Sequence, residues 1–200
     1  MRKTMQPHSR YIGIVVAVTG LVAVAAFAQR HRAASPEPPA YMAVAYVNGV
    51  PITKANVDSR IAALTAQAGS PANPADVRAL ALKLEINDEI LYQAAPNYGI
   101  TISQANLEGI ANQAAQQILA GGDESTKSEF QDNLQHLGIT VEQYSHDTRV
   151  LSAYKRGFLI SSMRRWIEDR MAPEDRISQQ AILTAIDQFI ANQHATVTYR

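Results

Sequence analysis

The 200-residue sequence has no cysteine, no excess of either charge and few aromatic residues. Without cysteine the chain has no disulfide scaffold, no thiolate zinc site, no iron–sulfur cluster and no thiol nucleophile. Its 18 basic and 18 acidic side chains balance. This balance argues against a nucleic-acid-binding protein, because such proteins normally carry a basic excess on one face. The length suits one domain with a short appendage.

The common catalytic and cofactor motifs are also absent. The sequence contains no glycine-rich phosphate loop, GxSxG elbow, HExxH motif or DxDxDG motif. His136 and His146 have carboxylates nearby, and we interpret them as solvated side chains of two helices. The pairs Asp88-Glu89 and Glu168-Asp169 are adjacent in sequence, so their side chains point in different directions on a helix. We therefore predict no catalytic residue, no cofactor and no metal site.

Charge is distributed unevenly along the chain. Residues 1–28 hold Arg2, Lys3 and Arg10 but no acid, and an uncharged run covers 11–28. As a helix this run would be about 27 Å long, near the lower limit for crossing a bilayer core of about 30 Å. Two interpretations stay open: a retained signal anchor, or a signal peptide cleaved after the small-x-small sequence at 26–28.

Both interpretations send the rest of the chain across a membrane. A retained span would keep the N-terminus in the cytoplasm, because the greater positive charge precedes it. Residues 29–42 include a proline-rich stretch and are predicted to be a linker. Residues 43–200 are then a single extracytoplasmic domain, periplasmic or at the cell surface.

The folded part is expected to begin and end with strands. Asn48-Gly49 lies between two apolar runs, which predicts a β-hairpin over 44–52 with a type I′ turn. Residues 195–199 alternate in polarity and predict a short strand. We expect this strand to pair with the hairpin, so that the two ends of the domain meet in one small sheet.

Helical periodicity and capping signals fill the sequence between these strands. Gly99 and Gly138 are each followed by an apolar residue and then a hydroxyl N-cap, which is typical of a joint between two helices. The fold class is therefore mainly α with a small β-sheet. The predicted helices cover 54–68, 75–95, 104–120, 126–137, one long helix at 141–171, and a last helix from Pro173 to about Asn192.

The long helix has more large apolar residues than one buried stripe needs. Five of them occupy more than one helical face: Tyr154, Phe158, Ile160, Met163 and Trp166. Two interpretations stay open, namely that all five belong to the core, or that they line a groove that takes up extended polypeptides. Arg164, Arg165 and Arg170 alternate with Glu168 and Asp169, which indicates a solvated, salt-bridged face.

Three stretches together resemble a known family. They are 44–53 (Val-Ala-Tyr-Val-Asn-Gly-Val-Pro-Ile-Thr), 84–95 (Leu-Glu-Ile-Asn-Asp-Glu-Ile-Leu-Tyr-Gln-Ala-Ala) and 98–103 (Tyr-Gly-Ile-Thr-Ile-Ser). In this order they resemble the N-terminal chaperone domain of the SurA and PrsA family of extracytoplasmic folding factors, and 130–144 is similar as well. Complete family members carry parvulin-type prolyl isomerase domains where this chain has only the Ala172-Pro173 joint.

The resemblance implies an ATP-independent chaperone, a holdase that binds unfolded exported polypeptides. No residue of the isomerase reaction has a counterpart in this sequence, so we predict no catalytic residue. The five apolar residues are predicted to bind clients. Two alternatives stay open: a prolyl isomerase or an accessory subunit of one, and a membrane-anchored structural partner of a single protein. The expected partners are unfolded polypeptides and, through an uncleaved N-terminal segment, the membrane; nucleic acid is not expected, and a homodimer stays open.

Overall fold

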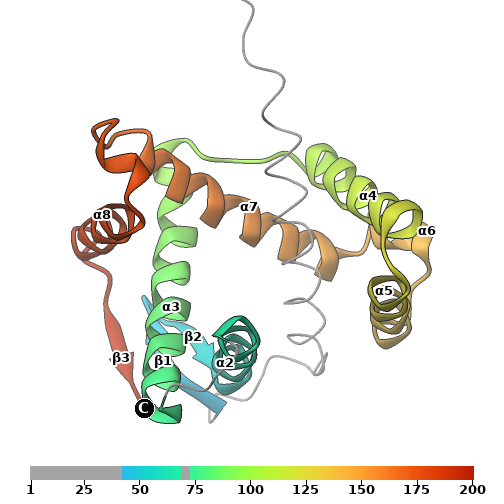
Figure 1. The fold of residues 1–200 in the computed structure, drawn as a ribbon, viewed down its shortest axis with the longest axis horizontal. Coiled ribbons are helices and arrows are strands. Elements are labelled where there is room, and N and C mark those ends of the chain that lie inside the picture. Colours follow the sequence, from blue (N-terminus) through green and yellow to red (C-terminus); the bar gives the residue numbers. More distant parts are fainter. Residues whose placement is uncertain (1–41, 69–72) are drawn as a thin grey trace, which may run out of the picture.

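The computed structural model describes residues 42–68 and 73–200, which form a set of helices around one small antiparallel sheet (Figure 1). The predicted mainly α fold with a sheet joining the two ends of the domain is confirmed. The predicted anchor or signal peptide and almost all of the predicted linker lie outside the described residues. Within the described ranges, no helix combines the length and the apolar character needed to cross a membrane.

The sheet has the strand order β2-β1-β3. β1 (Ala43–Val47) and β2 (Val50–Thr53) form the predicted hairpin, and both turn residues, Asn48 and Gly49, have the positive φ of a type I′ turn. β3 (Val197–Tyr199) pairs antiparallel with the other edge of β1. The first and last strands of the domain are therefore neighbours, as predicted.

Two helices cover the sheet and lead away from it. α2 (Lys54–Ala68) has the predicted bounds, with Thr53 accepting a hydrogen bond from the Asn56 amide. α3 (Pro74–Ala94) runs from the sheet to the opposite side of the molecule (Figure 1). It passes into the 3₁₀ turn η2 (Ala95–Tyr98), which contains Pro96 and is closed by Gly99 with a φ of 74°.

The next helices form a separate group. α4 (Gln104–Gly121) begins at the N-cap Ser103, and α5 (Glu124–Leu137) is closed by Gly138 with a φ of 67°. α5 starts two residues earlier than predicted because the Asp123 side chain, rather than a later residue, accepts from the Thr126 amide at 2.7 Å. The capping box of Thr140 and Gln143 is present and starts the short helix α6 (Val141–Tyr144).

The prediction of one helix over 141–171 is wrong. The chain turns after α6, and α7 (Thr148–Glu168) begins anew with Asp147 as its N-cap. One Asp147 oxygen accepts from the Arg149 amide at 2.9 Å and the Val150 amide at 3.3 Å. The apolar steps of three and four residues run through this turn, so the periodicity alone conceals it.

The C-terminal helix also begins later than predicted. Instead of a helix from Pro173, the structure has the 3₁₀ turn η3 (Asp175–Ile177) followed by α8 (Gln179–Ala191). Ser178 is the N-cap of α8 and accepts from the Ala181 amide at 3.3 Å. α8 packs on α7 and α3 and returns the chain to β3.

Hydrophobic residues gather in three clusters rather than one core. The distal cluster joins α4, α5, α6 and the first half of α7, with Phe130 fully buried. The sheet cluster joins β1, β2, α2 and α3, the last through residues from Ala81 to Ile90. The third cluster joins the end of α3, the second half of α7 and α8, with Leu91 and Met163 fully buried. α3 and α7 each contribute to two clusters.

Candidate functional site

The five apolar residues predicted to bind clients all lie on α7, but the structure divides them between two clusters. Tyr154 belongs to the distal cluster and is 8% exposed. Met163 belongs to the third cluster and is completely buried. Phe158, Ile160 and Trp166 are half-buried and pack against that same third cluster. Only these three therefore offer apolar surface to another molecule in this conformation.

Tyr154 has the contacts of a core residue. Its ring meets that of Tyr144 edge-on at 6.3 Å, and the two hydroxyls are 3.3 Å apart. Burial raises the pKa of Tyr144, as does the neighbouring Tyr154, and burial likewise raises the pKa of Tyr154. Phe130 completes the group with its ring 5.1 Å from that of Tyr144. Tyr154 thus holds α7 to α6, and Tyr144 in turn joins α6 to Phe130 of α5.

Trp166 lies in an aromatic cluster at the junction of η2, α7 and α8. We define this aromatic cluster as Tyr98, Trp166 and Phe189, with ring centroids 4.6 to 6.1 Å apart. Tyr98 is 37% exposed. The guanidinium of Arg170 lies 3.4 Å from the Trp166 ring centre, a cation–π contact, and Arg170 also donates to the Trp166 carbonyl. The cluster presents apolar surface beside a positive charge.

A buried charge network beside α7 was not foreseen from the sequence. Three carboxylates of α3 are almost inaccessible: Glu85 is 1%, Asp88 5% and Glu89 4% exposed. Arg60 of α2 donates to Glu85 at 2.8 Å and to Asp88 at 2.5 Å. From α7, Arg164 donates to Asp88 at 2.6 Å and Arg156 to Glu89. We call these six residues the ionic network; it joins α2, α3 and α7.

The ionic network is balanced, with three carboxylates facing three guanidinium groups. Burial alone would lower the pKa of Arg60, but attraction to Asp88 and Glu85 outweighs it and the pKa is raised. Because each carboxylate meets an arginine, the arrangement suits the joining of helices rather than proton transfer. The sequence did carry one signal for it, since three acids interrupt the most apolar stretch of α3.

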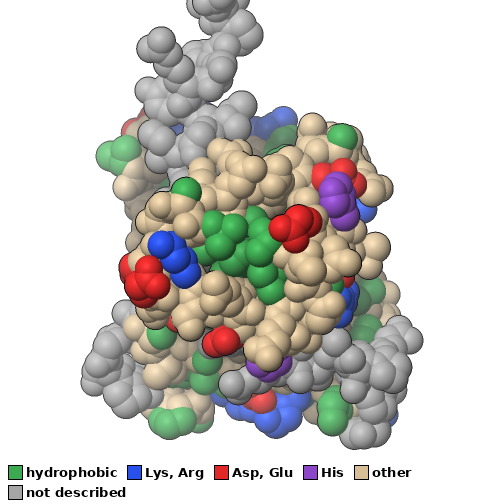
Figure 2. Space-filling model, turned by 90° about the vertical axis from the view of Figure 1, so that its right-hand side faces the viewer, with side chains coloured by type: hydrophobic (Ala, Val, Ile, Leu, Met, Phe, Trp, Pro, Cys, Tyr) green, Lys and Arg blue, Asp and Glu red, His purple; other side chains and the backbone are tan. Residues whose placement is uncertain are grey.

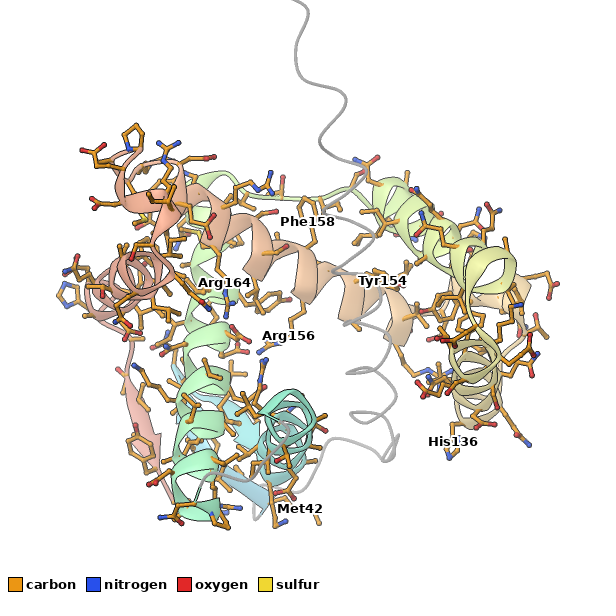
Figure 3. The ribbon with its side chains drawn as sticks, viewed as in Figure 1. Met42, His136, Tyr154, Arg156, Phe158 and Arg164 are labelled. Atoms are coloured by element: carbon orange, nitrogen blue, oxygen red, sulfur yellow. The ribbon has the colours of Figure 1, made fainter. Side chains whose placement is uncertain are left out.

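The arginine prediction is corrected at one position. The sequence suggested that Arg164 belongs to a solvated face paired with Glu168 and Asp169, but its partner is Asp88 on α3. Figure 3 shows Arg156 and Arg164 on the side of α7 that faces α2 and α3, and Phe158 on the opposite side. Arg165 is exposed and Arg170 covers Trp166, so only part of the predicted solvated face exists.

The small cavity near the hairpin is polar and structural. It measures about 200 Å³ and is lined by the side-chain amides of Asn48, Gln93, Asn97 and Gln193 together with Ile90, Ala94 and Ala195. Asn48 donates to Gln93 at 2.8 Å and accepts from the Thr196 amide at 2.8 Å. Gln93 also donates to the Val47 carbonyl at 3.2 Å. These amides tie the hairpin, α3 and β3 together.

The two histidines noted in the sequence make different contacts. His136 contacts the Asp132 carbonyl at 2.9 Å, one turn earlier on α5. His146 lies 3.7 Å from Glu108 of α4 and is largely exposed. In the part of the chain that the structure describes, no group of three or more acids and histidines is arranged to hold a metal ion.

The group of α4, α5 and α6 has an apolar area of its own. Figure 2 views this side of the molecule and shows hydrophobic side chains gathered at the centre, with acidic and basic side chains at the border. The half-buried Ile110, Ile139 and Val141 pack on the distal cluster from this group of helices. The five predicted client-binding residues all lie on α7, so Ile110, Ile139 and Val141 were not among them.

Comparison with known proteins identifies one family. A family model described as the SurA-like N-terminal domain matches residues 1–156, which spans the chain through the first part of α7. No curated protein and no solved structure gives a significant match. The match covers more than half of the 200 residues and agrees with the mainly helical fold. The chain belongs to the family of SurA-like N-terminal domains.

Proposed function

We propose that the protein is an extracytoplasmic, ATP-independent holdase that binds unfolded exported polypeptides. The observation that carries this proposal is the family match, since a SurA-like N-terminal domain implies a chaperone-like role. The client-binding residues are Phe158, Ile160 and Trp166, together with Tyr98 from the aromatic cluster. The proposal requires neither nucleotide nor metal, because burial of apolar surface supplies the binding free energy.

The chemistry of these residues suits loose and broad recognition. Apolar burial is worth about 25 cal/mol per Å² and needs apolar side chains in the client but no particular order of residues. Aromatic side chains add large area at little cost in conformational entropy, and Arg170 beside Trp166 adds a charge that acidic client segments attract. A surface of this kind binds many extended segments weakly rather than one tightly.

The extracytoplasmic location rests on the apolar run at 11–28 and its basic flank. Fractionation of expressing cells tests it, with the exported fraction expected to hold the protein. The intact mass of the recovered protein then separates the two interpretations of the N-terminus. A mass matching residues 29–200 indicates a cleaved signal peptide, and the full mass together with membrane association indicates an anchor.

Holdase activity is tested by light scattering of a chemically denatured client diluted into buffer with the purified 200-residue chain. We expect scattering to fall as the chain is added up to severalfold excess, without ATP. Trp166→Ala and Ile160→Ala should weaken this suppression. Leu80→Ala, a matched control at a 47% exposed apolar residue of α3, should not. Thermal melts of each variant separate lost binding from lost folding, and absence of suppression by the wild-type chain contradicts the proposal.

Two further measurements separate the alternatives. A protease-coupled assay on an Ala-Pro peptide detects prolyl isomerisation, and a rate above the uncatalysed one would assign an enzymatic activity instead. Affinity purification from cells distinguishes a mixture of clients, which the proposal expects, from one stoichiometric protein. A single stoichiometric protein would make the chain a structural partner.

A further inference from the structure

The hydrophobic clusters divide the described chain into two lobes. Every residue of the distal cluster, including the half-buried residues packed on it, falls between 102 and 154. Every residue of the other two clusters falls before 101 or after 157. We call residues 102–154 the distal lobe, and 42–68, 73–100 and 158–200 the sheet lobe. In Figure 1 the distal lobe lies apart from α2 and the sheet, with α7 reaching from one to the other.

Within residues 42–68 and 73–200, the chain passes between the lobes at two places. One is Thr101, which is exposed and separates Ile100, packed on the third cluster, from Ile102, packed on the distal cluster. The other is the segment 155–157 in the middle of α7, between Tyr154 and Phe158. Gly157 lies in this segment, is exposed, and has no neighbouring atom within 4 Å of where a Cβ would lie. Glycine inside a helix lowers its resistance to bending.

Hydrogen bonds and ion pairs follow the same division into two lobes. In the described ranges, the hydrogen bonds and ion pairs of distal-lobe side chains all end within that lobe, for example Arg149 on the Leu137 carbonyl at 2.8 Å and His146 beside Glu108 at 3.7 Å. The members of the ionic network other than Arg156, and the amides near the hairpin, lie in the sheet lobe. Neither clusters nor side-chain bonds therefore fix the angle between the lobes.

One side chain of the connecting segment is held by the sheet lobe. Arg156 donates to Glu89, which is 4% exposed and also accepts from Gln93 at 2.8 Å. The Arg156 guanidinium lies 5.2 Å from the centre of the Tyr92 ring. Glu89, Gln93 and Tyr92 are all on α3. Arg156 therefore ties the bendable middle of α7 to the sheet lobe.

We propose that the distal lobe pivots on the sheet lobe about Gly99–Thr101 and Lys155–Gly157, and that the Glu89–Arg156 ion pair is the latch that favours the arrangement seen in the structure. Breaking the pair frees the middle of α7 without disturbing either lobe, because each lobe has its own cluster. This inference goes beyond the proposed function and does not depend on it, since the lobes can pivot whether or not a client binds.

The absence of cysteine makes the motion directly measurable. Spin labels on Ala63→Cys of α2 and Gln131→Cys of α5, both exposed, report the distance between the lobes by double electron–electron resonance. Labels on Ala63→Cys and Thr184→Cys of α8 give a reference within the sheet lobe. We expect a broader distance distribution between the lobes than within the sheet lobe.

The latch is tested with Glu89→Gln/Arg156→Gln, which removes both charges and leaves no unpaired one buried. We expect the fraction of molecules whose distance between the lobes differs from that in the structure to rise about fivefold, the effect of losing one largely buried ion pair whose side chains are 22% and 6% exposed. Gly157→Ala should narrow the distribution by stiffening α7. Its matched control is Gly109→Ala, at a second helical glycine with open space around it, which should change nothing.

The inference is overturned if the distribution between the lobes is as narrow as the reference, or if the double variant leaves it unchanged. It is also overturned if Gly157→Ala and Gly109→Ala act alike. Circular dichroism and the reference distance show that the variants remain folded. Failure of the chaperone assay alone leaves these distance measurements, and therefore the inference, unaffected.

Discussion

Charged residues inside the protein are held in pairs. Asp88 is 5% exposed and accepts from Arg60 and Arg164, which come from two different helices. The attraction between such charges offsets the cost of removing them from water only while both partners are present. Asp88 therefore gives the junction of α2, α3 and α7 a defined geometry that depends on both of its arginine partners.

We expect Asp88→Asn to lower the free energy of unfolding by about 1–3 kcal/mol, because it leaves Arg164 without its charge partner and Arg60 with Glu85 alone. The control is Asp187→Asn, whose partner Lys83 lies at 2.7 Å but whose side chain is 49% exposed. This change should cost less than about 1 kcal/mol, as for other exposed pairs. Urea unfolding of both variants measures the difference, and equal losses would contradict a special role for the buried network.

Met163 is a core residue although the sequence also allowed it a place in a groove. We expect Met163→Ala to destabilise the protein by about 2–5 kcal/mol, because its side chain is completely buried and leaves a cavity. Met163→Leu keeps the volume and should cost less than about 1.5 kcal/mol. Chemical denaturation gives both values. A cost for Met163→Ala as small as that for Met163→Leu would indicate that the site is not tightly packed.

At the scale of elements, the beginnings of the helices are set by capping side chains. Asp147 both starts α7 and pairs with Arg149, whose terminal nitrogen lies 2.7 Å from Asp147 Oδ2. Hydrogen bonds from the Arg149 side chain, opposed in part by burial, hold the pKa of Asp147 below its ordinary value. The charged form of Asp147 is thus the one that stabilises the turn between α6 and α7.

This lowered pKa gives a prediction with a defined sign. A carboxyl whose pKa is lower in the folded state stabilises the folded protein at pH values above its unfolded-state pKa of about 3.9. This stabilisation disappears as the pH falls through the pKa of the folded state. Asp147→Asn keeps a capping oxygen but removes the charge, so it should cost about 0.5–1 kcal/mol at pH 6. The free energies of unfolding of the wild-type protein and the variant, measured from pH 6 down to acid, should converge. A difference that stays constant over this range would contradict this role of Asp147.

At the scale of the whole molecule, the C-terminal strand closes the sheet that the N-terminal hairpin begins. The backbone N–H of Asn48 donates to the Thr196 carbonyl at 2.8 Å, and Val197 packs on the sheet cluster. β3 is thus part of the sheet cluster although it is more than 140 residues from β1 in sequence. The sheet lobe requires both ends of the domain, whereas the distal lobe is built from one continuous segment.

Truncation after His194 tests this arrangement. We expect the backbone N–H of Asn48 to exchange with deuterium at least about tenfold faster than in the full chain, because it loses its acceptor and local opening becomes easier. The Ile139 amide, which donates to the Leu134 carbonyl in the distal lobe, is the internal control and should keep its protection. Hydrogen exchange followed by NMR reports both amides. Equal acceleration at the two positions would mean that the lobes do not unfold separately.

The elements that follow from local chemistry were predicted well. Asn48-Gly49 fixed the hairpin turn, Gly99 and Gly138 closed their helices with positive φ, and Thr140 with Gln143 formed the capping box. Each of these signals acts between residues only a few positions apart. The break at 145–147 was missed for a related reason, since Asp147 caps α7 while the apolar periodicity continues on both sides.

The amino-acid sequence by itself determined most of the helices, the hairpin, the pairing of the two chain ends and the resemblance to a family. The tertiary structure alone decided which α7 residues are buried, and it paired Glu85, Asp88 and Glu89 with arginines up to 76 residues away. It also separated the two lobes. The physical reason is distance along the chain: capping and turn formation act between neighbours, whereas burial and ion pairing depend on which helices pack together.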